Sequence, residues 1–346
     1  MAYSTINKST DYFNTVTYTG NGSYGKSVTG VGFQPDFIWI KNRSTTHSHR
    51  LSDAVRGTDK ALSSDNNSAE LSSVNLVHSF DSDGFTVDDD GAMNGNGNSI
   101  ASWNWKANGA GSSNTDGTIN STVSVNATAG FSIVKWTGNN TGGATVGHGL
   151  GAVPKMIIFR NYSITEDWTV YHHKLSSNNY KLDLNNTSAE ANVTNPYMEN
   201  TTPTNSLITL GDHQRVNGSG NSIIAYCFAE KTGYSKFGSY TGNGNADGTF
   251  VYTGFKPAFV IVKPSNYADN WHIIDNKRDT YNTMDSHLFA NLNNAEVTSS
   301  SYNFDMLSNG FKPRSNNTAF NGSYNYIYMA FGQSLVGSNN VPCTAR

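Results

Sequence analysis

The chain has 346 residues and a formal net charge of −3, with 14% charged and 12% aromatic residues. This length allows two or three cores of about 100 to 150 residues. Without a basic run, nothing marks a nucleic-acid surface, and no apolar stretch approaches the roughly 20 residues that span a bilayer. The aromatic content is too high for a disordered chain of this polarity.

The first residues are polar. Residues 1–11 predict an N-terminal arm or docking segment, and Met1 to Thr5 lack the charged and apolar regions of a signal peptide. We therefore expect a protein that is made in the cytoplasm of its host cell and is not exported through a signal peptide.

Three versions of one line follow along the chain, at residues 34–41, 153–160 and 256–263. In each version a proline and a variable residue precede an apolar run and a basic residue. An aromatic-Thr-Gly triplet lies upstream, and the aromatic-to-proline distances are 17, 18 and 17 residues, for Tyr18 and Pro35, Trp136 and Pro154, and Tyr240 and Pro257. The aromatic residues are 118 and 104 residues apart, which is a domain-sized period.

The patterning within each repeat is that of strands. The continuous apolar runs predict strands covered on both faces, and the leading proline suits the first residue of a strand. Each repeat closes with an Asn-Gly-rich turn and an aromatic strand that alternates, as in Trp103 and Trp105. We predict an all-β fold of three tandem β-sandwich repeats of jelly-roll or concanavalin-like type.

The expected boundaries follow composition. The three sandwich repeats cover residues 12–107, 128–231 and 232–334, with a Gly- and Ser-rich linker at 108–127 and a polar C-terminal tail at 335–346. Within the linker, residues 122–125 could also pair as an edge strand. The short junction at 231–234 predicts that the second and third repeats are closely coupled. Whether the repeats have separate cores or a shared one stays open at this stage.

An acidic residue recurs at one place in each repeat, eight positions after a leucine: Glu70, Glu190 and Glu296. Glycan hydrolysis would need a second carboxylate about 5 to 9.5 Å away. Asp53 and Asp275 could serve in the outer repeats, but the middle repeat has His172 at that place. Three equivalent acids favour a loop-anchoring role, so we expect no catalytic residues and a protein that is not an enzyme.

No metal or cofactor is expected. Asp81 and Asp83 resemble a calcium-binding cluster, but the third repeat keeps that turn without the charges, so a turn suffices as the explanation. The adjacent histidines, His47 with His49 and His172 with His173, lack the spacing of a zinc site. Cys227 is interpreted as a small buried side chain, and a disulfide with Cys343 is the alternative.

Aromatic residues near turns are the candidates for ligand binding. Trp168 and Trp271 occupy matching places in two repeats, where the first repeat has His49, and Tyr171 lies close by. Flat rings can stack on the C–H face of a sugar, so these three aromatic residues are the candidate glycan-binding residues. The alternative is that they are core or interface residues.

Several lines of the sequence resemble a known family, namely residues 1–8, 29–36, 147–151, 224–230 and 252–260. They are similar to a repeat family of virion structural proteins from tailed bacteriophages of marine bacteria. The resemblance covers nearly the whole chain. It implies a tail fibre-like or capsid-decorating protein with a lectin-like sandwich fold, and it supplies no catalytic residues.

The sequence thus predicts a structural protein of a bacteriophage virion, displayed on tail or capsid for host attachment or particle decoration. The expected partners are other virion proteins and further copies of the chain, with a host-surface glycan as the alternative partner. A carbohydrate-binding receptor-recognition module is the alternative function, and a glycan depolymerase is a third.

Overall fold

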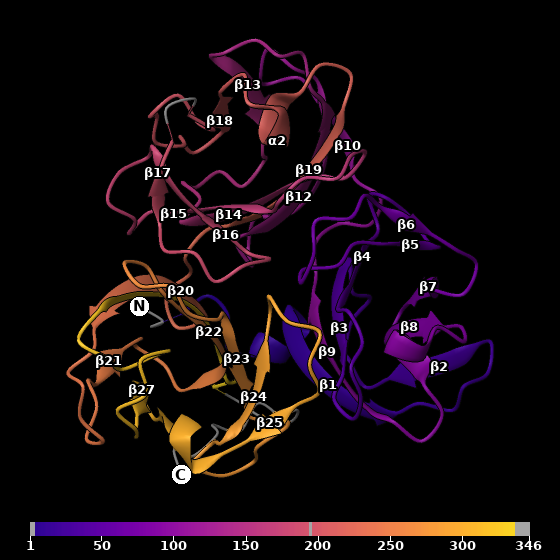
Figure 1. Cartoon of the computed structure of the whole chain (residues 1–346). Coiled ribbons are helices and arrows are strands. Elements are labelled where there is room, and N and C mark those ends of the chain that lie inside the picture. Colours follow the sequence, from indigo (N-terminus) through magenta and orange to yellow (C-terminus); the bar gives the residue numbers. More distant parts are fainter. Residues whose placement is uncertain (1–3, 194–195, 336–346) are drawn as a thin grey trace.

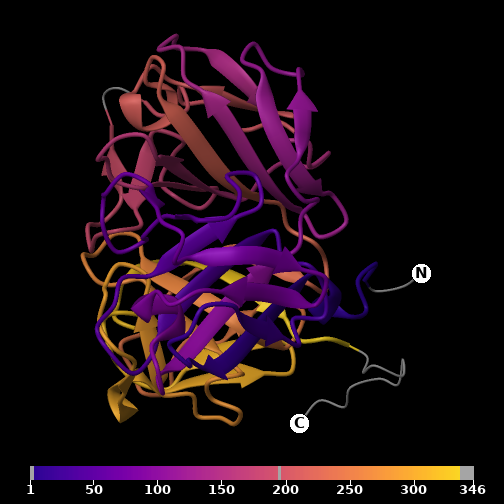
Figure 2. The same ribbon diagram turned by 90° about the vertical axis from the view of Figure 1, so that its right-hand side faces the viewer.

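The computed structural model describes residues 4–193 and 196–335. The protein is nearly all β, with several antiparallel sheets, which confirms the predicted fold class. Its three repeats form three lobes around a common centre (Figure 1). The view turned by 90° shows the lobe of repeat 2 above the other two (Figure 2). Within the described residues, no helix is long and apolar enough to cross a membrane.

Repeat 1 consists of a main sheet and a small sheet. The main sheet has the order β1 (Phe13–Thr19), β9 (Ser99–Trp105), β3 (Phe37–Asn42) and β4 (Arg50–Asp53). The small sheet has the order β2 (Lys26–Thr29), β8 (Gly84–Val87) and β7 (Val77–Asp81), and β5 (Lys60–Ala61) pairs with β6 (Leu71–Ser72). The short helices are η1 (Ser9–Asp11) and α1 (Gly91–Asn94).

Repeat 2 has the longest main sheet. Its order is β10 (Ser112–Asn114), β11 (Ser121–Asn126), β12 (Phe131–Thr137), β19 (Ser222–Phe228), β14 (Met156–Asn161), β15 (Thr169–His172), β16 (Tyr180–Asp183) and β17 (Ala191–Asn192). The small sheet pairs β13 (Ala144–Gly147) with β18 (Leu207–Leu210), and α2 spans Gln214–Asn217. Two parts of the stretch that composition marks as a linker are therefore strands of this sheet, β10 and β11.

Repeat 3 again has two sheets. The main sheet has the order β20 (Ser235–Thr241), β28 (Asn325–Gly332), β22 (Pro257–Pro264), β23 (His272–Asp275), β24 (Ser286–Phe289) and β25 (Val297–Thr298). The small sheet has the order β21 (Val251–Tyr252), β27 (Gly310–Pro313) and β26 (Phe304–Leu307), and η2 spans Ser300–Tyr302. The finer expectation of jelly-roll or concanavalin-like sandwiches stays a prediction.

The proline-led strands explain how the repeats pack. In β3, Phe37 and Trp39 enter a core shared by all three repeats, whereas Ile38 and Ile40 enter the core of repeat 1. Strands β14 and β22 divide their side chains in the same way. Both faces of each main sheet are thus buried, one in its own repeat and one at the centre, which is why the runs are continuously apolar.

The shared core is rich in aromatic contacts between repeats. Phe37 of repeat 1 stacks on Tyr226 of repeat 2, with ring centroids 4.1 Å apart. Phe13 of repeat 1 stacks on Phe331 of repeat 3 at 4.8 Å. Trp105 contacts rings of both other repeats. The three repeats therefore have their own cores and also share a central one, which answers the question that the sequence left open.

The chain ends of the described region meet. Ile6 is buried in the shared core, the Leu335 amide donates to Asn7 O at 2.9 Å, and the Thr10 amide donates to Ser334 Oγ. The arm expected at residues 1–11 is therefore docked from residue 4 onward. Of the expected tail, residues 336–346 lie outside the described residues.

Candidate functional site

The recurring acids lie at the contacts between repeats. In repeat 1, Arg56 Nε lies 2.6 Å from Asp53 Oδ2 and Arg56 Nη1 lies 3.0 Å from Glu70 Oε1. The first pair is buried, with side-chain exposures of 1% and 0%. Buried charges are tolerated only when they are paired and hydrogen-bonded, and here one guanidinium pairs with two carboxylates, while Lys60 Nζ lies 3.9 Å from Glu70 Oε2.

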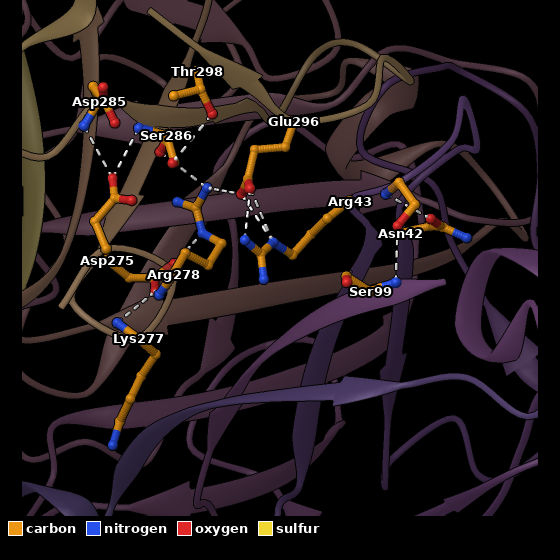
Figure 3. A network of polar contacts seen from close by, with 12 residues as sticks. Asn42, Arg43, Ser99, Asp275, Lys277, Arg278, Asp285, Ser286, Glu296 and Thr298 are labelled. Atoms are coloured by element: carbon orange, nitrogen blue, oxygen red, sulfur yellow. Dashed lines mark hydrogen bonds and ion pairs between the residues drawn. The ribbon is translucent and has the colours of Figure 1, made fainter. Parts of the chain in front are cut away.

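Repeat 3 repeats this cluster. Arg278 Nε lies 2.6 Å from Asp275 Oδ2, and Arg278 Nη1 lies 2.8 Å from Glu296 Oε2 (Figure 3). Arg43 reaches across from repeat 1 and places Nη2 2.6 Å from Glu296 Oε1. Arg278 opposes the effect of burial and holds the pKa of Asp275 below its usual range, and Arg43 and Arg278 do the same for Glu296. A general acid needs a raised pKa, so these acids are suited to anchoring rather than to proton donation.

Repeat 2 has no counterpart of Arg56 and Arg278, so its recurring acid Glu190 has other partners. Glu190 accepts hydrogen bonds from the Ser176 amide at 2.8 Å and from Ser176 Oγ at 2.9 Å. Burial lowers the pKa of His172 to about 3, so the ring is neutral, and its Nε2 lies 3.3 Å from Tyr328 O in repeat 3. The difference between the copies therefore reflects two ways of satisfying one interface.

Each repeat is bonded to the next through equivalent positions. The amides of the three recurring acids donate to the neighbouring repeat: Glu70 to Tyr162 O at 2.8 Å, Glu190 to Ser265 O at 2.6 Å, and Glu296 to Arg43 O at 2.9 Å. The aspartates that share an arginine with two of these acids are also bonded across repeats: Tyr226 Oη donates to Asp53 at 2.8 Å and Trp103 Nε1 donates to Asp275 at 3.0 Å. The order of contacts is cyclic, so that repeat 1 also meets repeat 3.

The candidate glycan-binding tryptophans belong to the same set of contacts. Trp168 and Trp271 are 0% and 1% exposed. Trp168 Nε1 donates to Ser63 O of repeat 1 at 2.8 Å, and Trp271 Nε1 donates to Asp183 O of repeat 2 at 2.9 Å. His49, at the matching place, has Nε2 3.0 Å from Phe289 O of repeat 3. Both tryptophans are therefore interface residues between repeats, which was the alternative interpretation.

Tyr171, the third candidate residue, is also inside the protein. It is 4% exposed and packs in the core of repeat 2. Burial raises its pKa to about 12. Stacking on a sugar requires an exposed ring face, and none of the three candidate residues offers one.

Sequence reasoning noted the basic residue that ends each proline-led line but gave it no role: Lys41, Arg160 and Lys263. All three are buried and donate to backbone carbonyls of another repeat, namely Asn293, Asn67 with Ser68, and Thr187. Burial lowers the pKa of Lys41 to about 8 and that of Lys263 to about 7. The signal was available, because a basic residue stands at the same place in all three copies.

The remaining sequence candidates have local partners. Asp83 accepts from the Gly32 amide at 2.7 Å and Asp81 accepts from Thr86 Oγ1 at 2.8 Å, which are the contacts of a loop anchor. Among the described residues there is no group of three or more His, Cys, Asp or Glu side chains that could hold a metal ion. Cys227 is a free, buried cysteine whose pKa burial raises to about 12. Its proposed alternative partner, Cys343, lies outside the described residues.

A groove of about 540 Å³ lies on the surface between repeats 2 and 3. Strand β20 and residues 250–252 line it from repeat 3, while Lys155, Lys174 and Glu230 line it from repeat 2. Phe250 and Tyr252 are 44% and 58% exposed. Unlike the buried clusters, this groove combines exposed rings with charged side chains, so it is an accessible site for a partner.

The fold and these contacts define an all-β protein of three interlocked repeats. By sequence, the chain belongs to a family described as a domain of unknown function (DUF7483), whose model matches residues 8–334. No curated protein and no solved structure matches the chain.

Proposed function

We propose that this protein is a structural component of a bacteriophage virion, displayed on the tail or capsid, where it contributes to host-surface attachment or decorates the particle. The observation that carries the proposal is the use of the repeated polar residues. Acids, basic residues and tryptophans that recur between copies are buried in contacts that lock one repeat to the next. Such a body is rigid and presents loops outward, which suits a display protein rather than a catalyst.

The sequence resemblance to virion proteins of marine tailed phages supports the same proposal. Its partners are then other virion proteins, and further copies of the chain arranged by the symmetry of the particle. The alternative of a carbohydrate-binding module loses its three candidate residues to the interior, because a buried ring cannot stack on a sugar.

The test is to locate the protein on particles. A peptide tag inserted at Tyr281, which is 82% exposed, would be carried by the phage genome that encodes the chain, and purified particles would be labelled with gold-conjugated antibody. Regular labelling of tail or capsid is expected. Particles that contain none of the protein by mass spectrometry would refute the proposal, and cleavage of a host polysaccharide by the purified protein would overturn the structural role.

A further inference from the structure

The groove between repeats 2 and 3 runs along the edge of a sheet. The five consecutive β20 residues from Lys236 to Tyr240 all line it. Because side chains alternate between the two faces of a strand, consecutive residues can share one groove only where it follows the backbone edge. Strand β20 is at the end of its sheet, and β21, which lines the opposite wall, is at the end of the small sheet.

Part of this edge has free backbone groups. The backbone amide and carbonyl of Phe237 point away from β28. Glu230 Oε2 accepts from this amide at 3.4 Å, and His173 Nε2 lies 2.9 Å from this carbonyl oxygen. Backbone groups alternate in direction along an antiparallel strand, so the amide and carbonyl of Ser239 also face the groove. Within the part of the chain that the structure describes, no group pairs with them. A short unpaired edge therefore begins at Ser239.

The same protein shows what fills the equivalent groove in repeat 2. There the strand equivalent to β20 is β12, which is covered by β11 instead of ending its sheet, and Lys135 precedes the repeat aromatic as Ser239 does in repeat 3. Lys135 is paired with Thr122 of β11. The same segment reaches the small sheet, because the Ile119 amide donates to Thr145 O at 2.9 Å. One extended segment, residues 117–126, thus bridges the two sheet edges in repeat 2.

Repeat 3 has no such segment of its own, because only residues 232–234 separate β20 from the isolated bridge residue Lys231. The lysines that line the groove indicate the charge of the segment that would fit it. Lys155 and Lys174 have no carboxylate within ion-pair distance among the described residues, and Lys236 faces Glu230 at 3.7 Å. The chain's own residues 336–346 contain no Asp or Glu, so they are a poor match for these lysines.

We infer that this groove accepts an extended, acidic segment of another protein, which adds to the edge of β20 at Ser239 as a β-strand and places carboxylates against Lys155 and Lys174. The inference rests on the proposed function for the nature of that protein, another virion component. Strand addition supplies backbone hydrogen bonds, and the exposed rings of Phe250 and Tyr252 supply apolar contact for alternate side chains.

The test uses the full chain and a library of random 12-residue peptides. Selected peptides are expected to alternate apolar residues with others and to carry at least one acidic residue. Ser239→Pro removes the amide at an edge position, where proline is tolerated, and should weaken binding at least about tenfold. The double variant Lys155→Glu, Lys174→Glu should do the same through charge alone, while Tyr281→Ala, on an exposed residue outside the groove, should leave binding within about twofold.

Circular dichroism and the melting temperature of each variant establish that it folds. If Ser239→Pro does not fold, the charge variant still tests the inference. Peptides that bind wild type and both groove variants equally, or a library that yields no binder, would overturn it. Binding of a heparin oligosaccharide that is lost in both groove variants, without peptide binding, would assign the groove to an anionic glycan instead. These measurements need no virion, so they can fail while particle labelling succeeds, or the reverse.

Discussion

Replacing Arg278 by methionine tests whether the buried ion clusters hold the repeats together. Methionine keeps most of the apolar volume but removes the guanidinium from both of its carboxylate partners. Asp275 would remain fully buried without a counter-ion, and Glu296, only 12% exposed, would keep Arg43 alone. Hydrogen bonds from Arg278 to the carbonyls of Ile273 and Ser286 would also be lost. Breaking a buried pair by removing one partner costs about 3–5 kcal/mol, and we expect a loss of unfolding free energy in that range.

The measurement is urea unfolding followed by tryptophan fluorescence, with Arg43→Met as the matched control. Arg43 is more exposed and pairs with Glu296 only, so its loss should cost about 1 kcal/mol. The sign of the pH effect follows from the lowered pKa of Asp275 in the folded protein. That shift stabilises wild type above the unfolded value near pH 4, and the contribution is lost as the pH falls. The difference between wild type and Arg278→Met should therefore shrink below about pH 4. A loss of under 1 kcal/mol for Arg278→Met at pH 7, or equal losses for both variants, would refute the reasoning.

Three further predictions concern the repeats. A fragment of residues 108–231, which keeps β10 and β11, should not fold as a monomer, because it exposes Phe131, Met156 and Phe228 of the shared core; a monomeric peak in gel filtration with a native β spectrum would contradict this. Trp168→Phe should lower the unfolding free energy by about 1–3 kcal/mol by leaving Ser63 O unpaired, without changing peptide binding at the groove; an unchanged urea midpoint would count against the contact. The pKa of His49, His172 and His272 is about 3 in the folded protein, against about 6.5 unfolded. The stability they confer is complete above pH 6.5 and falls toward pH 3, by about 2 kcal/mol for each histidine at pH 5, and urea midpoints that do not differ between pH 7.5 and pH 5 would disprove it.

The repeat and its strands could be predicted because they are periodic in the sequence. The proline-led runs indicated strands covered on both faces, and β3, β14 and β22 have both faces buried. What covers the second face could not be read, since an apolar side chain looks the same whether it packs within a repeat or against a neighbour. The segment at residues 112–126 was interpreted as a linker in which only residues 122–125 could pair, because its glycines, serines and asparagines are those of a linker, although it forms β10 and β11.

The candidate site shows the limits of composition more sharply. Aromatic residues near turns made Trp168 and Trp271 candidates for glycan binding, with core or interface packing as the alternative, and their indole N–H groups donate to carbonyls of a neighbouring repeat. Lysine and arginine are almost never fully buried unless they are paired, so Lys41, Arg160 and Lys263 were not considered as interior residues. Comparison of the copies was the better guide, because residues at equivalent positions make equivalent contacts. The groove beside β20 is an exception, because here the copies differ. In repeat 2 the segment at residues 117–126 covers the equivalent strand β12, whereas β20 ends its sheet in repeat 3.

The cyclic order of contacts fixes the number of repeats. In an open stack of repeats, a copy can be gained or lost at either end with little effect on the others. Here repeat 1 bonds to repeat 3 through Arg43 and Glu296 just as it bonds to repeat 2, and Asn7 meets Leu335 where the ring closes. A fourth copy would have no free contact to join, and a missing copy would open the aromatic centre to water. Gene duplication could therefore enlarge this protein through its outer loops but not through its count of lobes.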